Sequence, residues 1–152
     1  GKAWLKDGRV VSVEVVNLDR KSDHAWCVLD IHSPDVAYAL LSDVMPRPGE
    51  RVYHGGYGVD KPGNREEGTV VQPDNGAGQT QYKISVSSGD SGGGIAFTEN
   101  GRLLSPVCCT TQKGAVADVW GATVSAVRAT RPGRVLANEE WTPLEIPLKM
   151  PE

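Results

Sequence analysis

Short runs with an apolar side chain at every second position dominate the chain, and this period predicts β-strands. Residues 81–86 alternate as a half-buried strand does, and residues 10–16 are rich in β-branched side chains. Residues 24–31 are mostly apolar, which predicts a central, buried strand. Five further strands are expected, at residues 50–58, 69–71, 95–97, 103–110 and 115–121.

Turn signals separate these strands. Asp7-Gly8 and Asn100-Gly101 predict tight turns, because both dipeptides accept a positive φ. Eighteen glycines and ten prolines, together with many Val and Thr residues, favour an all-β fold with tight turns. Only residues 122–128 suggest a helical turn, and residues 131–152 are proline-rich and polar, which predicts an extended tail.

Composition excludes several classes of protein. The net charge of −3 implies no basic face, so nucleic acid is not an expected partner, and no apolar run approaches the ~18 residues of a membrane span. The three cysteines, two of them adjacent, do not make a disulfide framework and favour a reducing compartment such as the cytoplasm. No metal-ligand spacing is present, so neither a metal nor a cofactor is expected. Because the chain begins with Gly1 and not Met, we expect a processed or excised piece.

The stretch Gly89-Asp90-Ser91-Gly92-Gly93 carries the strongest chemical signal. It lies between two predicted strands, so Ser91 is expected on a glycine-lined turn with its hydroxyl exposed. A serine becomes a nucleophile when a base takes its proton, and acyl transfer also needs N–H donors aimed at the developing oxyanion. Glycines let the backbone aim such donors, and the N–H groups of Gly89 and Ser91 would form the oxyanion hole.

This motif resembles the nucleophile motif of chymotrypsin-like serine proteases. The similarity is greatest to disulfide-poor members, such as the HtrA type and the serine proteases of positive-strand RNA viruses. The resemblance implies two β-barrels with the active site between them, a polypeptide substrate, and a triad in the order His, Asp, Ser. It covers residues 4–128, and only the nucleophile motif is specific.

Asp23 is the expected acid of the triad. In the family this aspartate lies just before an apolar strand, and Asp23 similarly precedes residues 24–31 at the mouth of that strand, where its carboxylate would be half desolvated. A role as an ordinary turn residue is the alternative for Asp23. Three other carboxylates are weaker candidates, namely Asp19, Asp30 and Asp35.

The resemblance also assigns substrate contacts. Residues 85–88, the strand that holds Val107, Cys108, Cys109 and Thr110, and the strand near Trp120 would wall the pocket for the substrate side chain before the cleaved bond. The floor of that pocket would be Ser85. Because Ser85 is not a carboxylate, a neutral or apolar substrate side chain is expected rather than Lys or Arg.

The catalytic base is missing from the expected place. The family's histidine precedes the aspartate by a few tens of residues, which would fall before Gly1, and about three strands precede the linker instead of six. One explanation is that an N-terminal segment or a second chain supplies the histidine and the missing strands. A second is that His24, His32 or His54 serves as the base, although His24 and Asp23 would point to opposite faces of a strand. A third is an inactive scaffold.

We therefore predict a chymotrypsin-like double β-barrel whose second barrel is complete and whose first is partly present. Residues 1–45 would hold the end of the first barrel and the linker, residues 46–130 the second barrel, and residues 131–152 the tail. The predicted function is that of a serine endopeptidase, as in viral or other processing proteases, nearly inactive as this chain alone. The alternative is a non-catalytic binding or assembly module, which the histidine deficit favours.

Overall fold

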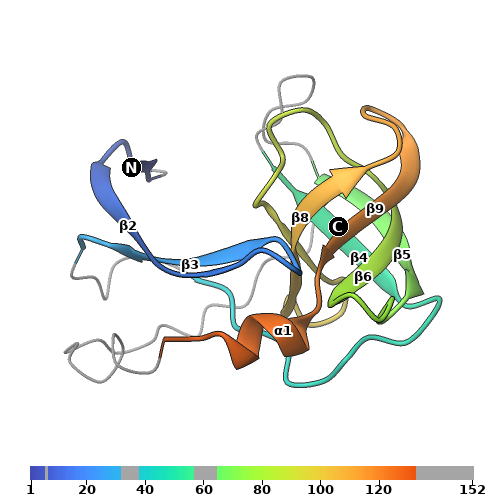
Figure 1. Cartoon of the computed structure of the whole chain (residues 1–152). Helices are drawn as coiled ribbons and strands as arrows, with labels where there is room; N and C mark the ends of the chain where they lie inside the picture. Colours follow the sequence, from blue (N-terminus) through green and yellow to red (C-terminus); the bar gives the residue numbers. More distant parts are fainter. Residues whose placement is uncertain (6, 32–37, 57–64, 133–152) are drawn as a thin grey trace.

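The computed structural model describes residues 1–5, 7–31, 38–56 and 65–132. The chain is almost entirely β in this part: a three-stranded sheet precedes a closed six-stranded barrel, and a short helix lies beneath both (Figure 1). This arrangement confirms the all-β class and the complete second barrel with a partial first. The predicted tail lies outside the described residues from position 133 onward.

The three-stranded sheet is antiparallel in the order β1-β2-β3. Its strands are β1 (Lys2–Trp4), β2 (Val10–Asp19) and β3 (His24–Leu29). The predicted Asp-Gly turn joins the first two, with Gly8 at a φ of 92°. The polar segment at residues 17–23 is only partly a turn, because a bulge after Val15 lets β2 continue in register with β3 as far as Asp19.

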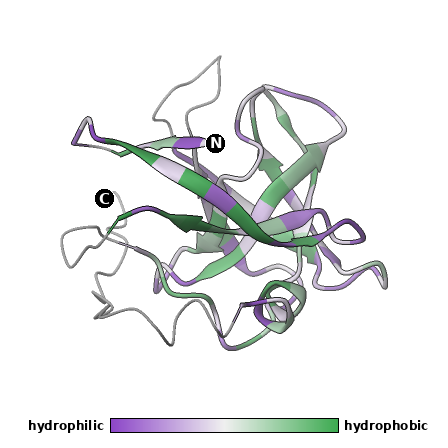
Figure 2. Ribbon diagram, turned by 60° about the vertical axis from the view of Figure 1, so that its left-hand side comes forward, coloured by the Kyte–Doolittle hydropathy of each residue, from purple (hydrophilic) through white to green (hydrophobic). Residues whose placement is uncertain are grey.

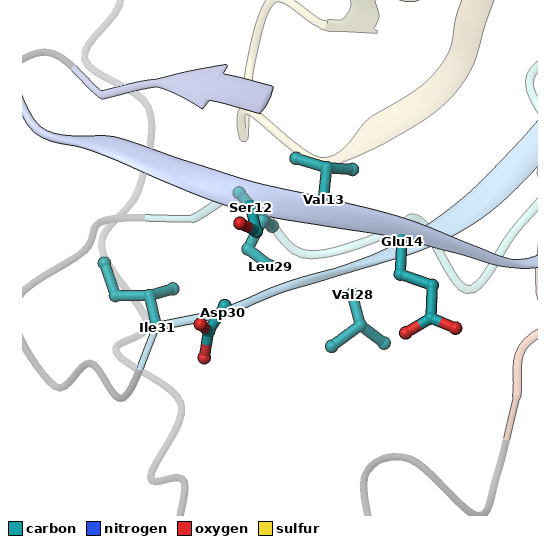
Figure 3. A pocket seen from close by; sticks show the side chains of 7 residues that line it. All are labelled: Ser12, Val13, Glu14, Val28, Leu29, Asp30 and Ile31. Atoms are coloured by element: carbon teal, nitrogen blue, oxygen red, sulfur yellow. The ribbon is translucent and has the colours of Figure 1, made fainter. Parts of the chain in front are cut away.

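The prediction that residues 24–31 form a buried central strand is wrong. Exposed and covered residues alternate along β3, and Leu29 is 39% exposed. Figure 2 shows hydrophobic positions along the strands of this sheet. The described residues place no second layer over its outer part, and several further apolar side chains are exposed there. They are Trp4, Val10, Val15, Val16 and Leu18. A hollow of about 370 Å³ on the sheet is lined by residues 12–14 and 28–31 (Figure 3).

Six antiparallel strands close the barrel in the order β4-β5-β6-β9-β8-β7. They are β4 (Arg51–Gly55), β5 (Arg65–Gln72), β6 (Gln79–Ser85), β7 (Gly94–Phe97), β8 (Leu103–Thr110) and β9 (Val116–Ala122). Their inward side chains form one apolar core: Val52, Val70, Tyr82, Ile84, Val86, Ile95, Phe97, Leu104, Val107 and Val119. This single core makes the barrel the rigid body on which the loops are held.

One polar pair lies inside this core. The hydroxyl groups of Tyr82 and Ser105 are 2.6 Å apart, which satisfies both groups away from water. Burial raises the pKa of Tyr82, so its hydroxyl remains protonated at any physiological pH.

The helix α1 (Val124–Ala129) fixes the β2–β3 hairpin against the barrel. The indole N–H of Trp26 donates to the carbonyl of Val127 at 2.9 Å, and the side-chain amide of Asn17 donates to the carbonyl of Thr130 at 2.7 Å. The ring of His24 lies 2.7 Å from the Thr130 hydroxyl. These contacts place the turn before β3 at the edge of the barrel. In the described part of the chain, no helix is long and apolar enough to cross a membrane.

Candidate active site

The loop between β6 and β7 presents Ser91 to solvent. Ser91, Gly89 and Gly92 are exposed, whereas Asp90 between them is only 8% exposed. Gly89 has a φ of 93° and Gly92 a φ of 86°, a region that residues with a Cβ rarely adopt. The glycines therefore turn the chain sharply on both sides of Ser91, so that its hydroxyl stands clear while its neighbour is buried.

Hydrogen bonds within the loop hold this shape. The N–H of Asp90 donates to the carbonyl of Ser87 at 3.1 Å, and the N–H of Gly93 donates to the carbonyl of Asp90 at 2.8 Å. The Asp90 carboxylate also accepts the N–H of Ser87 at 2.8 Å. Within the part of the chain described, the N–H groups of Gly89 and Ser91 donate to no protein atom. Both are therefore available to an acceptor from outside.

Strand β8 lies directly beside the loop. Its residue Val107 accepts the N–H of Gly92 and donates its own N–H to the carbonyl of Gly93, both at 2.8 Å. A bulge between Val107 and Cys109 interrupts the pairing of β8 with β9. The loop is thus attached to β8 at the position immediately before Cys108.

The side chain of Cys108 contacts Asp23. The Asp23 carboxylate lies close enough to the Cys108 thiol to affect its ionisation, and the Cys109 sulfur lies 2.6 Å from that of Cys108. Burial above all, and then these two neighbours, raises the pKa of the Cys108 thiol. Asp23 itself is exposed and has a φ of 59°, so the expected half-desolvated position is wrong. The reason is that Asp23 belongs to the hairpin turn, not to the strand.

The contact between Asp23 and Cys108 predicts the reactivity of the thiol. We expect iodoacetamide at neutral pH to alkylate Cys108 more slowly than the exposed Cys27, because only the thiolate reacts and the raised pKa keeps its population small. Replacing Asp23 with asparagine removes the negative charge, so alkylation of Cys108 should accelerate about 10-fold. Peptide mass spectrometry measures both rates. Unchanged alkylation in Asp23→Asn would show that the two side chains do not interact.

The two described histidines are buried and contact groups other than the Ser91 hydroxyl. His24 is 8% exposed, and its ring contacts the hydroxyl groups of Ser22 at 2.9 Å and Thr130 at 2.7 Å. His54 on β4 is 2% exposed, and its ring contacts the Gly94 carbonyl at 3.0 Å and the Asp90 carboxylate at 3.3 Å. His32, like Asp35, lies outside the described residues. The hydrogen bonds and ion pairs of both described rings are with groups other than Ser91.

The residues expected to contact the substrate lie on β6 and β8, which both pair with β9. Ser85, at the end of β6, is 5% exposed and lies opposite Val116. Val107 lies opposite Gly121, and Cys109 opposite Trp120. Thr110 donates through its hydroxyl to the carbonyl of Asp118 at 3.0 Å. Among the described residues no group of three or more His, Cys, Asp or Glu side chains could hold a metal ion.

Sequence reasoning missed the pairing of His54 with Asp90. His54 was considered only as a candidate base, and no partner was assigned to Asp90. A usable signal was present, because a carboxylate buried in a glycine-rich loop requires a donor, and His54 is on a strand that brackets the same loop.

Known proteins resemble this chain in fold but not detectably in sequence family. No family model and no curated protein matches the sequence. Among solved structures, the Rv3671c protease in its inactive form matches with a TM-score of 0.65 and 17% sequence identity, over 85% of this chain and 69% of that one. A serine-to-alanine mutant of Rv3671c from M. tuberculosis H37Rv, also in its inactive form, matches with a TM-score of 0.64 and 16% identity, over 93% of this chain and 72% of that one. The chain therefore has a chymotrypsin-like, serine-protease fold.

Proposed function

We propose that this chain is the nucleophile-bearing part of a chymotrypsin-like serine endopeptidase. Ser91 would be the nucleophile, the N–H groups of Gly89 and Ser91 the oxyanion hole, and Asp23 the group that orients a histidine from outside this chain. The observation that carries the proposal is the continuous series of contacts from Ser91 through Gly92, Val107 and Cys108 to Asp23. It supports the proposal because a triad requires a carboxylate and a serine hydroxyl at one site, and β8 is adjacent to both the loop of Ser91 and the turn of Asp23.

The chemistry follows from these positions. An imidazole between Asp23 and Ser91 would accept the hydroxyl proton as the serine oxygen attacks the peptide carbonyl. The unpaired N–H groups of Gly89 and Ser91 would donate to the oxyanion of the tetrahedral intermediate, and the imidazolium would then protonate the leaving amine. Water, deprotonated by the same imidazole, would release the acyl group from Ser91. The Asp23 carboxylate would stabilise the imidazolium in both steps.

The exposed apolar side chains of the three-stranded sheet support a contribution from outside the chain. Trp4 is 73% exposed and Val15 57%, although both lie in regular strands. Such surfaces usually face another element. In this proposal residues 1–45 belong to the first barrel and its linker and residues 46–130 to the second, and a further segment or chain supplies both the remaining strands and the histidine.

The substrate preference in this proposal is for a neutral or apolar side chain before the cleaved bond. A serine at position 85 offers no negative charge to bind Lys or Arg, and burial of Ser85 in the barrel wall suits an uncharged pocket floor. We also propose that the enzyme processes a polyprotein, as serine proteases of positive-strand RNA viruses do. All three cysteines are free, which supports this role because those viral enzymes are also disulfide-poor.

A non-catalytic binding module is the second candidate. The observation that favours it is that the rings of His24 and His54 are both engaged elsewhere. An intact nucleophile motif with two unpaired N–H groups favours the enzyme, because a module that only binds does not require them.

Labelling of Ser91 by a fluorophosphonate distinguishes the serine endopeptidase from the non-catalytic binding module. We expect at most trace labelling of residues 1–152 alone, because in this proposal the base comes from outside the chain. Addition or fusion of the polypeptide that normally precedes Gly1 should increase the rate by about 10³-fold or more. Ser91→Ala provides the matched control and should abolish the label. Rapid labelling of the chain alone would refute an external base, and no labelling of the longer protein would favour the binding module.

A further inference from the structure

His54 connects the two ends of the nucleophile loop. It lies on β4, in register with Ile95 of β7, and it is 2% exposed. Its Nδ1 atom is 3.0 Å from the carbonyl oxygen of Gly94, which follows Ser91 in the chain. Its Nε2 atom is 3.3 Å from Oδ2 of Asp90, which precedes Ser91. One buried ring therefore contacts the backbone on one side of the nucleophile and the side chain on the other.

The chemistry of these atoms fixes where protons must lie. A carbonyl oxygen only accepts, so Nδ1 of His54 must carry a proton and donate it to Gly94. Nε2 also faces an oxygen, and two acceptors at 3.3 Å repel unless one of them carries a proton. A proton on one of these two atoms would remove the repulsion and make the 3.3 Å approach favourable in the buried site.

Asp90 depends on this ring because it has few other partners. Its Oδ2 atom accepts the N–H of Ser87 at 2.8 Å, and its Oδ1 atom has no hydrogen-bond partner among the described residues. A buried carboxyl group with one backbone donor is costly unless a further donor compensates it. Among the described residues, the His54 ring is the side chain that faces this carboxylate: its Nε2 atom lies at ion-pair distance, 3.3 Å from Oδ2, without hydrogen-bond geometry.

Two glycines pack closely against the pair. A Cβ added to Gly56 would lie 2.4 Å from Oδ1 of Asp90 and 3.0 Å from Nε2 of His54. A Cβ added to Gly93 would lie 2.9 Å from Cε1 of His54. Because real Cβ atoms essentially never approach so closely, the space around the pair is filled. A shift of the ring would move the loop that holds Ser91.

We propose that His54 is a positioning residue for the nucleophile loop: through Asp90 and Gly94 it holds the N–H groups of Gly89 and Ser91 in the arrangement that receives an oxyanion. It does not touch the substrate, and it is not the base. The oxyanion role rests on the function proposed above, whereas the effect of His54 on the shape of the loop does not. The two parts can therefore be tested separately.

Three substitutions at position 54 distinguish the contact of Nδ1 with the Gly94 carbonyl from that of Nε2 with the Asp90 carboxylate. Glutamine keeps a donor near the position of Nε2, asparagine keeps one near that of Nδ1, and phenylalanine keeps the ring shape with neither donor. We expect His54→Phe to speed hydrogen exchange at the amides of Ser87 and Asp90 about 10- to 100-fold relative to the wild type, as the loss of a charge-assisted contact implies. His54→Gln should restore most of the protection at these amides, and His54→Asn should not.

His24→Phe is the matched control, because His24 is also a buried ring with two polar contacts. It should loosen the β2–β3 hairpin but leave the exchange of the nucleophile loop within about twofold of the wild type. Equal acceleration of the loop in His24→Phe and His54→Phe would overturn the proposal, since the effect would then be a general loss of stability. Failure of glutamine to do better than asparagine would also overturn it.

NMR of the His54 ring in the wild-type chain gives a second readout that requires no activity. Nitrogen-15 shifts should show a protonated Nδ1 at neutral pH, and the Nε2 signal should move in Asp90→Asn. An unprotonated Nδ1 would refute the assignment. In the longer protein, His54→Phe should lower kcat about 10-fold or more with KM little changed, because an oxyanion hole acts in the transition state. If wild-type Ser91 proves unreactive in that protein, the proposed function fails, while exchange and NMR still decide the role of His54.

Discussion

Asp23→Asn is expected to lower kcat/KM about 10³- to 10⁴-fold in the assembled enzyme, in which the proposed external segment or chain supplies the histidine. The amide cannot stabilise an imidazolium, and it favours the wrong tautomer of the base. Asparagine is the informative substitution, because position 23 has a φ of 59°, which asparagine tolerates and alanine does not. The backbone of the turn should therefore survive the change, and circular dichroism and thermal unfolding should be unaltered.

Asp30→Asn is the control for this prediction. Asp30 is exposed like Asp23 and lies at the other end of β3, where its side chain lines the hollow on the three-stranded sheet (Figure 3). We expect its kcat/KM to remain within about twofold of the wild type, as is usual for an exposed residue outside a site. If Asp23→Asn retains full activity while Asp30→Asn does not, the acid of the triad has been assigned to the wrong carboxylate.

Gly121→Ala is expected to destabilise the barrel by about 3 kcal/mol, at the upper end of the range for overpacked cores. A Cβ on Gly121 would lie 2.3 Å from the carbonyl oxygen of Pro106 and 2.8 Å from Cβ of Ser105. Both atoms belong to β8, so the substitution would force β8 and β9 apart at the position where Val107 holds the nucleophile loop. Urea unfolding followed by tryptophan fluorescence measures the loss.

Gly55→Ala serves as the matched strand control. Gly55 ends β4, and a Cβ there would meet no atom within 4 Å. The substitution should be neutral or stabilising by about 0.5 kcal/mol, because alanine loses less backbone entropy on folding. Equal destabilisation by both variants would show that the close approach at Gly121 is relieved by a backbone shift at little cost.

Most of the strands could be predicted from the sequence alone, because their period and turn residues are local signals. Residues 103–110 coincide with β8, and the Asp-Gly turn occurs where it was expected. The burial of β3 could not be predicted in this way. An apolar run shows what a strand can bury but not which elements will cover it, and in the described structure the outer part of that sheet is uncovered.

At the candidate site, too, local features could be predicted from the sequence and long-range contacts could not. The sequence by itself determined that Ser91 lies on a glycine-rich turn between two strands, because glycine spacing and alternation are properties of neighbouring residues. Only the tertiary structure brought Cys108 to Asp23 and His54 to Asp90, over separations of 85 and 36 positions in the sequence. Closure of the barrel and docking of the hairpin on α1 create these contacts, and no local pattern encodes the register in which distant strands meet.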